Sequence, residues 1–203
     1  MRYLSTYNTD QEILMAFSDI FLKGEWFDAD ITYSKGIFYT PLTQGLITTQ
    51  MRQPRIKSDI EPQFDDVLKM DSQHLDLIED DSLKSIVFDP PFLFRNRQSD
   101  NNDRMSERFS YFQTYEDLME MYTNTLKETY KKLKKGGYLF FKCQDMTDGK
   151  FYCTHYDIIT EAQNMGFTLK DIGLKISKSK LQRDAKQQNC LAKTHSFWLV
   201  FKE

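Results

Sequence analysis

The sequence is poor in cysteine, and this shortage limits the kinds of site and compartment that fit it. Its 203 residues include three cysteines, none of them in a C-x-x-C pair. Such a set supports neither a disulfide framework nor a zinc site, and a reducing cytoplasm is the expected location. We expect the three histidines to be structural or surface residues, so no metal is predicted. The residues concerned are Cys143, Cys153, Cys190, His74, His155 and His195.

A long apolar segment is also absent from the sequence. No stretch approaches the ~20 apolar residues that a membrane-spanning helix requires. The first residues carry Asp10 and Glu12, where a secretory signal peptide would need an apolar run. We therefore expect neither a membrane segment nor a signal peptide.

Charge is unevenly distributed along the chain. The whole sequence has 28% charged residues and a net charge of −3, which is ordinary for a globular domain. Residues 127–203, however, carry 15 Lys and Arg against 8 Asp and Glu, whereas residues 1–126 carry 12 against 22. This asymmetry favours one basic surface that could bind nucleic acid. Solvated lysines on helices and loops would explain the charge equally well.

The most informative segment is Ser85-Ile-Val-Phe-Asp-Pro-Pro-Phe92. Its first half is mainly β-branched and aromatic and predicts a short buried strand. The two prolines cannot continue a strand, because proline lacks the backbone N–H and has a fixed φ. We therefore expect a stiff turn that presents a carboxylate and an aromatic ring at the carboxyl end of a strand, where open α/β sheets bind ligands.

The turn Asp89-Pro90-Pro91-Phe92 resembles motif IV of the amino-methyltransferases, which methylate the exocyclic nitrogen of adenine or cytosine. The resemblance implies catalytic roles for all four residues. The Asp89 carboxylate and the Pro90 carbonyl would accept hydrogen bonds from the target amine, and Phe92 would stack on an extruded base. A plain Pro-Pro loop at the end of a strand is the alternative.

The segment after the first predicted strand, residues 26–32, departs from the family pattern. The resemblance implies a glycine-rich loop that lets the backbone approach S-adenosylmethionine, but the sequence has no Gly-x-Gly. Similar Asp-x-Thr-x-Ser-x-Gly-x-Phe-Tyr segments occur in small phage-encoded proteins that resemble DNA methyltransferases. A polar turn between two strands is the alternative. The cofactor contacts that the resemblance implies are Asp30, Thr32, Ser34 and Gly36.

An acid ends each of the next two predicted strands as well. Asp59 ends a strand over residues 55–60, and the resemblance makes it the candidate for the ribose hydroxyls of the cofactor. Asp71, followed by Ser72, ends a strand over residues 65–70 and corresponds to a position near the cofactor adenine. Because a doubly wound sheet lines these strand ends along one edge, we expect the acids to lie along that edge together.

Two polar segments, residues 93–110 and 177–193, are expected to be mobile loops. The first carries four arginines and could close over a nucleotide with Phe94 near the pocket, although a plain loop is at least as good an explanation. The second, extended to residues 175–193, has six basic residues and one acid. It is the best candidate for contact with nucleic-acid phosphates. The candidate contacts are Lys178, Lys180 and Arg183.

The remaining elements complete an α/β pattern. Helices are predicted within residues 1–24, from Thr114 onward and over 156–166, and strands over 138–142, 167–176 and 196–201. The runs LKKGGYLFFK and KTHSFWLVFK resemble a helix–turn–strand unit and the terminal strand of class I methyltransferases. The predicted fold is one Rossmann-like domain over residues 1–203, with a mostly parallel sheet, helices on both faces and an antiparallel C-terminal strand.

The resemblance implies methyl transfer from S-adenosylmethionine to an exocyclic amine of a nucleobase. Adenine N6 in DNA is the expected target, because an acidic first position in motif IV favours adenine over cytosine. One alternative is an RNA or ribosomal-RNA N6-adenine methyltransferase. The other, which the missing Gly-x-Gly motivates, is a non-catalytic nucleic-acid-binding module with a degenerate methyltransferase fold.

Overall fold

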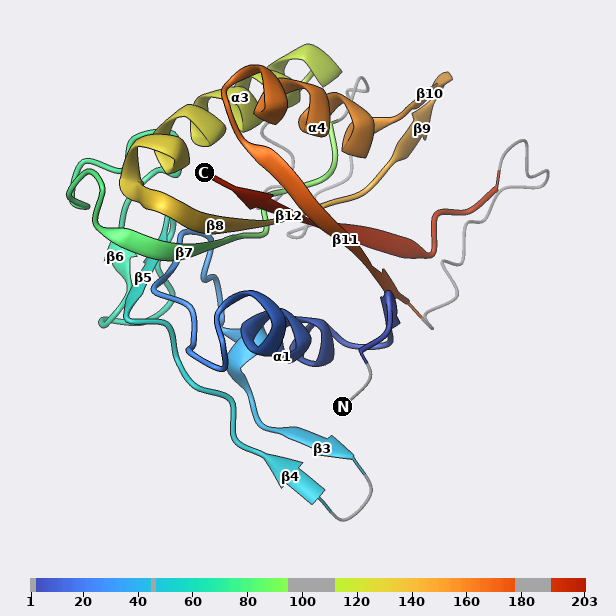
Figure 1. Ribbon diagram of the computed structural model, residues 1–203. Helices are drawn as coiled ribbons and strands as arrows, with labels where there is room; N and C mark the ends of the chain where they lie inside the picture. Colours follow the sequence, from blue (N-terminus) through green and yellow to red (C-terminus); the bar gives the residue numbers. More distant parts are fainter. Residues whose placement is uncertain (1–2, 45–46, 95–111, 178–190) are drawn as a thin grey trace.

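An eight-stranded sheet runs through the middle of the molecule (Figure 1). The computed structural model describes residues 3–44, 47–94, 112–177 and 191–203. The strands of this sheet are β1 (Thr6–Tyr7), β2 (Ala29–Asp30), β5 (Ile56–Asp59), β6 (Leu68–Lys69), β7 (Leu83–Phe88), β8 (Leu133–Cys143), β11 (Thr168–Ile176) and β12 (His195–Lys202). Their order along the sheet is β1-β11-β12-β8-β7-β2-β5-β6.

The strand directions agree with the predicted fold. β12 runs antiparallel to both of its neighbours, β8 and β11, whereas the pairs β8–β7, β7–β2, β2–β5 and β5–β6 are parallel. The prediction of a mostly parallel sheet with an antiparallel C-terminal strand is therefore confirmed. The chain passes from β2 outward to β5 and β6, then returns to β7 on the other side of β2. Open α/β sheets bind ligands at such a reversal, outside the carboxyl ends of the strands.

Helices cover both faces of the sheet, as predicted. α1 (Asp10–Phe21) lies on one face, and α3 (Tyr115–Lys132) and α4 (Thr154–Asn164) lie on the other (Figure 1). Thr9 and Thr114 begin α1 and α3 with capping boxes, in which the threonine hydroxyl accepts a backbone N–H three residues later. The sequence predicts both starts, with Thr9 or Asn8 as the cap of α1 and Thr114 as the cap of α3. None of the helices in the described residues is long and apolar enough to cross a bilayer.

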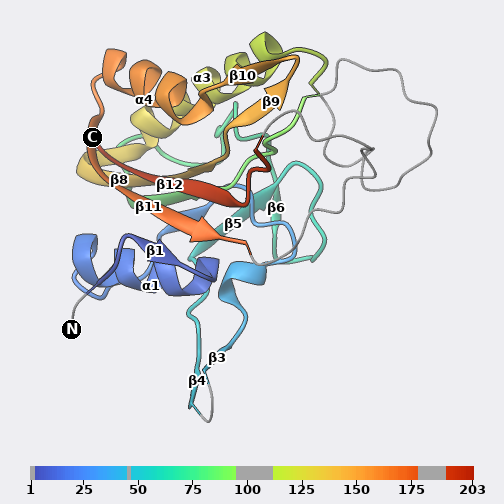
Figure 2. The same cartoon turned by 90° about the vertical axis from the view of Figure 1, so that its right-hand side faces the viewer.

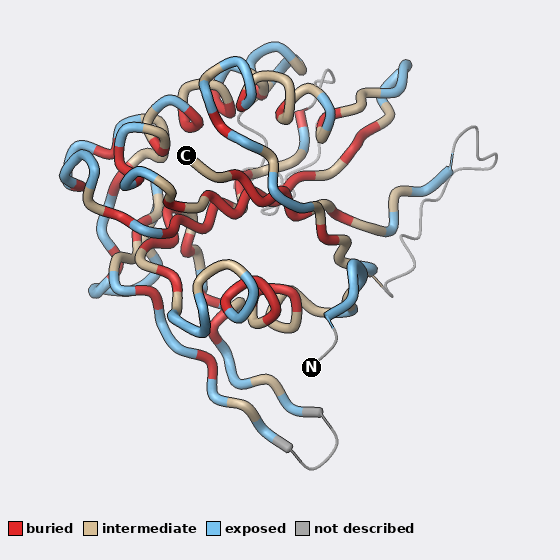
Figure 3. Tube along the Cα trace, in the orientation of Figure 1, coloured by how far each residue is buried: buried red, intermediate tan, exposed pale blue. Residues whose placement is uncertain are grey.

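Alternate side chains of the central strands supply the two layers of the core, and the buried residues follow these strands in Figure 3. In β7, Ile86 and Phe88 pack on the side of α3 and α4, whereas Val87 packs on the side of α1. Neighbouring strands alternate in the same way, so that Phe140 of β8 faces α1. Because the period of a strand is two residues, the side chain at position 142 of β8 also faces α1.

Two strands are shorter than the sequence predicts. β2 occupies two of the predicted residues 26–32, because the chain turns after Asp30, where the Thr32 backbone N–H donates to the Asp30 carboxylate at 2.9 Å. β6 occupies two of the predicted residues 65–70. The residues before it form a turn in which the Val67 N–H donates to the Phe64 carbonyl at 3.1 Å.

Helix α3 ends earlier than the sequence predicts. The basic run of residues 131–135 suggests a helix that continues to Gly136, but α3 ends at Lys132 and β8 begins at Leu133. The Leu133 side chain is fully buried and pairs in register with Leu83 of β7. Burial of this leucine against the sheet therefore outweighs the local preference of the lysines for a helix.

Two hairpins lie outside the central sheet and are missing from the sequence-based assignment. β3 (Leu42–Gln44) and β4 (Ile47–Thr49) extend away from the sheet (Figure 2), within residues 40–54, a segment that no sequence pattern assigns. β9 (Met146–Asp148) and β10 (Lys150–Tyr152) form a second hairpin between β8 and α4. A 3-10 helix at Ile37–Tyr39 follows β2.

Candidate functional site

The predicted Asp-Pro-Pro-Phe turn lies at the carboxyl end of β7, in the centre of the sheet. Its first residue is held by the loop after β2, because the Asp89 backbone N–H donates to the Thr32 hydroxyl at 2.7 Å. Its other end is held by α3, where the Tyr122 hydroxyl donates to the Pro91 carbonyl at 2.7 Å. The turn is thus fixed from two sides, and the Phe92 side chain beyond it is half-buried.

A lysine that the sequence analysis did not single out reaches the Asp89 carboxylate. The Lys142 Nζ atom lies 3.3 Å from Asp89 Oδ2 and 3.1 Å from Asp10 Oδ1 of α1. The Lys142 side chain is only 10% exposed, so this cation is largely removed from water. Three aromatic rings lie within cation–π distance of the ammonium group. They are Phe38 at 4.8 Å, Trp198 at 5.6 Å and Phe92 at 5.8 Å.

These charges set the ionisation of Asp89. Burial raises the pKa of the Asp89 carboxyl to about 6, a rise that Lys142 reduces and that Asp10 increases. Burial lowers the pKa of the Lys142 ammonium, but Asp89 and Asp10 outweigh this effect and raise it above its ordinary value. Asp89 is therefore mainly ionised at neutral pH, with a protonated lysine against one of its oxygens.

Asp30 forms the second half of this centre. Its carboxylate is 1% exposed and accepts hydrogen bonds from the Tyr39 hydroxyl at 2.7 Å and from the Thr32 backbone N–H at 2.9 Å. Burial raises the pKa of the Asp30 carboxyl to about 7; these hydrogen bonds lower it, and the charge of Asp89 raises it further. Thr32 bridges the two acids, since its hydroxyl also lies 3.4 Å from Asp30 Oδ1.

The rest of the predicted cofactor loop folds over the end of β5. The Ser34 backbone N–H donates to Asp59 Oδ2 at 2.8 Å, and the Glu61 N–H donates to Asp59 Oδ1 at 2.9 Å. Gly36 has φ 63°, and a Cβ atom there would lie 2.4 Å from the Tyr33 hydroxyl. The glycine is therefore needed for the path of the loop itself.

The last pair of predicted cofactor residues lies beside α3. The Ser72 hydroxyl is 3.2 Å from the Thr125 hydroxyl of α3, and the Asp71 carboxylate accepts the Gln73 backbone N–H at 2.9 Å. Since β6 is the outermost strand on this side, the acids after β7, β2, β5 and β6 occur in the order of the strands along one edge. The structure brings Asp30, Thr32 and Asp89 into direct contact and sets Asp71 and Ser72 apart from them.

Of the four predicted substrate contacts, only Phe94 lies within the residues that the structure describes. Phe94 is buried, with its ring centroid 5.8 Å from Tyr115 and 5.2 Å from Tyr152. The structure thus shows Phe94 in an aromatic cluster, and its contact with a substrate stays a prediction. The other predicted contacts, Lys178, Lys180 and Arg183, lie outside the described residues.

A cavity of about 220 Å³ adjoins the Asp89 turn. Phe92 and Lys142 form one side of it, and the facing ends of β11 and β12 form the other. The Gln144 side chain closes one wall, since its Nε2 donates to the His195 carbonyl at 2.7 Å. The volume is below the roughly 300–1,000 Å³ of pockets for drug-sized ligands, so it suits a single small ring. The lining residues are Phe92, Lys142, Gln144, Lys175, Ser177, Lys193, Thr194, His195 and Ser196.

Sequence reasoning missed Asp10, Lys142 and Trp198, although one signal for Lys142 was available. A lysine that ends the apolar run of a buried strand, on the same face as Phe140, requires a charged partner. Asp10 gave no such signal, because an acid in the first turn of a helix is explained by the helix dipole. Its contacts with Lys142 and Trp198 join residues far apart in the chain.

Comparisons with known proteins bear on both the site and the fold. The family model N6_N4_Mtase, described as DNA methylase, matches residues 83–203, which include the Asp89 turn and Lys142. No protein of the curated set shows significant similarity to the chain.

Solved structures resemble the chain at low sequence identity. A SAM-dependent methyltransferase from Archaeoglobus fulgidus is 14% identical, with 95% of this chain and 94% of that chain covered and a TM-score of 0.50. The N-methyltransferase NodS from Bradyrhizobium japonicum, in complex with S-adenosyl-L-homocysteine, is 13% identical, with 96% and 88% covered and a TM-score of 0.50.

A protein from Thermus thermophilus assigned as a DNA modification methylase is 15% identical, with a TM-score of 0.47. The match covers 66% of this chain and 50% of that chain, so the present chain spans about half the length of that relative. Since the family model matches more than half of the chain, the protein belongs to this DNA methylase family, and its fold is that of the S-adenosylmethionine-dependent methyltransferases.

Proposed function

We propose that the protein transfers a methyl group from S-adenosylmethionine to an exocyclic amine of a nucleobase, with adenine N6 in DNA as the target. The observation that carries the proposal is the Asp89 carboxylate, which is fixed by Lys142 at the carboxyl end of β7 beside a ring-sized cavity. The family match to DNA methylases supports DNA as the nucleic acid, and the choice of adenine rests on the acidic first residue of the turn, Asp89.

The carboxyl edge of the sheet has the chemistry that the cofactor requires. Asp30 is a buried carboxylate for which no lysine or arginine among the described residues provides an ion pair, and a cation beside it would remove the cost of its ionisation. Each oxygen of Asp59 accepts one backbone N–H, which leaves acceptor capacity for a pair of hydroxyls. S-adenosylmethionine supplies a sulfonium cation, ribose hydroxyls and an electrophilic methyl group when it is bound.

Within this scheme Asp89 holds the target nitrogen. An exocyclic amine conjugated with a ring is a weak nucleophile, and a carboxylate that accepts its N–H directs the nitrogen and stabilises the positive charge that develops on it. Formation of the new N–C bond requires the nitrogen to lose one proton. Asp89 is a suitable acceptor, because its pKa of about 6 leaves it ionised at neutral pH and still basic enough to bind that proton.

Phe92 provides a surface for the base. Its half-buried ring lines the cavity together with Lys142, and stacking of an extruded base on such a ring is worth about 1–3 kcal/mol. The short stiff turn between Asp89 and Phe92 would fix the ring and the carboxylate relative to each other.

Single-turnover methylation of DNA and RNA oligonucleotides, with product analysis for N6-methyladenine and N4-methylcytosine, tests the proposal. Asp89→Ala should lower the rate with little effect on cofactor affinity, because the interaction of Asp89 with the target amine strengthens in the transition state.

Phe92→Ala should weaken oligonucleotide binding, and Phe92→Tyr should preserve it. Methylation by Asp89→Ala at the parent rate would refute the assignment, and methylation of RNA alone would correct the substrate. Oligonucleotide binding without any methylation would identify a binding module.

A further inference from the structure

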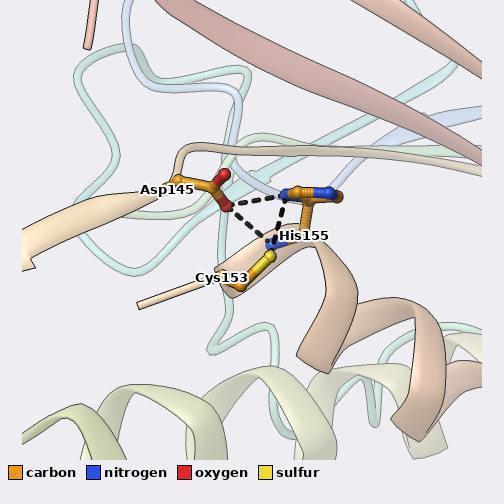
Figure 4. A group of neighbouring side chains, drawn as sticks. All are labelled: Asp145, Cys153 and His155. Carbon is orange, nitrogen blue, oxygen red and sulfur yellow. Dashed lines mark hydrogen bonds and ion pairs between the residues drawn. The ribbon is translucent and has the colours of Figure 1, made fainter. Parts of the chain in front are cut away.

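Three side chains with metal-binding groups meet between the end of β8 and the start of α4 (Figure 4). They are Asp145, Cys153 and His155. The His155 Nδ1 atom lies 2.8 Å from Asp145 Oδ1 and 3.8 Å from Cys153 Sγ, and all three ligand atoms lie within 4.8 Å of one another. None of these residues has a part in the proposed methyl transfer.

The geometry excludes a catalytic triad and fits a shared ligand. The Cys153 sulfur and the Asp145 oxygen both approach the same ring nitrogen of His155, Nδ1, whereas a nucleophile and an acid in a triad contact opposite ring nitrogens. Zinc bonds of about 2.0–2.3 Å in a tetrahedron place neighbouring ligand atoms roughly 3.3–3.8 Å apart. The observed spacings bracket this range, so small side-chain rotations would give three ligands around one ion.

The side chain at the start of α4 gives independent support. Cys153 is the N-cap residue of this helix but forms no side-chain capping hydrogen bond, a position at which serine, threonine or aspartate normally stabilises the helix. Asp145 caps the helix instead, by accepting the His155 backbone N–H at 3.2 Å. The thiol is thereby left to face His155 Nδ1.

The charges at this point also favour a cation with two positive charges. Asp145 is 6% exposed, and its only ion-pair partner among the described residues is His155. A thiolate and a carboxylate together neutralise a divalent ion, which removes the repulsion that the positive end of the α4 dipole would otherwise exert. Phe197 stacks on the His155 ring at 4.2 Å between centroids, which holds the ring in the orientation that the cluster requires.

We propose that Asp145, Cys153 and His155 bind a zinc ion, with water in the fourth position. The ion would connect the end of β8 to the start of α4 and so close the β9–β10 hairpin between them. Binding displaces the thiol proton of Cys153 into solvent, and His155, bound to the ion through Nδ1, carries its ring proton on Nε2. The sequence analysis expected no zinc site, because the cysteines form no C-x-x-C pair and the histidines were expected to be structural or surface residues; it did not consider Cys153 and His155 together with Asp145.

Cobalt substitution tests the site directly, independently of methyl transfer. Protein freed of metal with a chelator should develop a thiolate-to-cobalt charge-transfer band on titration with Co²⁺, and Zn²⁺ should displace the cobalt. Cys153→Ser should abolish the band, and the buried-thiol control Cys143→Ala should retain it. Zinc affinity of Cys153→Ser should fall at least about tenfold, the lower limit seen for groups that only support a ligand. A parent protein without the band would overturn the proposal.

A second variant separates the metal role of Asp145 from its role as a helix cap. Asp145→Asn keeps an oxygen that can accept the His155 N–H but removes the charge that favours the ion. Zinc should raise the melting temperature of the parent and raise that of Asp145→Asn much less, while the two metal-free proteins should melt at similar temperatures. Equal zinc-induced shifts in both proteins would show that the ion binds elsewhere.

Discussion

The Lys142 ammonium group lies between two carboxylates, Asp89 and Asp10, and contacts both. Each of these three residues comes from a different element, β8, the turn after β7, and α1. The lysine therefore positions Asp89 and lowers its pKa against the effect of burial. A group whose ionised form is required for reaction gives a rate that falls as the pH drops through its pKa.

Lys142→Gln should move the acidic limb of the pH–rate profile to higher pH. The parent should lose activity below about pH 6, where Asp89 takes up a proton. Without Lys142 the pKa of Asp89 rises, because burial and the charge of Asp10 both act in that direction and only the weaker effect of Lys175 opposes them. Single-turnover rates measured from acid to neutral pH give the limb directly.

Two further variants make that measurement specific to Lys142. Lys134→Gln removes an exposed lysine from the same strand and should leave the profile unchanged. Lys142→Arg keeps the charge and should bring the acidic limb of the profile part of the way back to its parental position. A profile for Lys142→Gln that coincides with the parent's would show that this lysine does not control Asp89.

Asp30 should make folding stability depend on pH. The pKa of its carboxyl is about 7 in the folded protein, against 3.8 for an ordinary aspartate, so between these values the native state holds a proton that the unfolded chain has released. Stability must then fall as pH rises through this window. Asp30→Asn cannot ionise, so its stability relative to the parent should improve between pH 4 and pH 8 by on the order of 2–4 kcal/mol.

Urea unfolding of both proteins at several pH values measures this difference. Asp76→Asn, at an exposed acid, is the matched control and should show almost no change relative to the parent. An Asp30→Asn effect of the same size at pH 4 and pH 8 would mean that Asp30 does not carry a raised pKa.

At the scale of elements, the sequence predicts what local chemistry determines. The starts of α1 and α3 are encoded by Thr9 and Thr114 with acids three residues on, and the strand before Asp89 is encoded by an apolar run that ends at two prolines. The predicted bounds of β2 and β6 were wrong, because a turn after Asp30 ends β2 and a turn before Leu68 delays β6. The few residues that remain in each strand are those that pair with neighbours distant in the chain, which no local pattern contains.

The parts of the candidate site differ in the same way, because some are contiguous in the sequence and others are brought together only by the fold. The Asp89 turn is a contiguous motif and can be recognised from the sequence. Its supports are not contiguous: the Asp10 carboxylate also accepts a hydrogen bond from the Trp198 indole, 188 residues away. Only the arrangement of α1 against β8 and β12 brings these groups to Asp89, and the sequence alone could not predict it.

We predict from the sequence that the segment between β11 and β12 contacts nucleic-acid phosphates. Its two described ends meet beside the cavity, where the Ser177 N–H donates to the Thr194 carbonyl at 2.7 Å and Lys175 and Lys193 line the wall. Neutralising Lys178, Lys180 and Arg183 together should weaken oligonucleotide binding and reduce the slope of log affinity against log salt by up to roughly three units.

Titrations at several salt concentrations measure that slope. A control with the same change in charge replaces three exposed lysines around the end of α3, Lys127, Lys134 and Lys135, by glutamine. This control should retain nearly the parental slope. Equal losses in the two triple variants would indicate a general effect of net charge, without a specific contact by the loop.

At the scale of the whole molecule, acidic and basic charge are segregated along the chain and along the sheet. Residues 1–126 hold the excess of acids; besides β1 at the far edge, they contribute β2, β5 and β6, whose carboxyl ends carry the candidate cofactor residues, and β7, which ends at the candidate catalytic turn. Residues 127–203 hold the excess of bases and contribute β8, β11 and β12, which border the cavity. This division predicts that cofactor binding and nucleic-acid binding can be weakened separately.

Calorimetry with S-adenosylmethionine tests the candidate cofactor site at Asp59, at the carboxyl end of β5. Asp59→Ala removes the acceptor proposed for the ribose hydroxyls and should weaken binding by about 1–3 kcal/mol, while oligonucleotide affinity and its salt slope stay at the parental values. Part of this loss could come from the loop, because Asp59 also accepts the Ser34 and Glu61 N–H groups. Asp59→Asn keeps one acceptor oxygen for the loop and should lose less affinity. If folded Asp59→Ala binds the cofactor as tightly as the parent, the ribose lies elsewhere. If the parent shows no binding heat and no thermal shift, the acids at the carboxyl ends of the strands have a structural role and do not bind the cofactor.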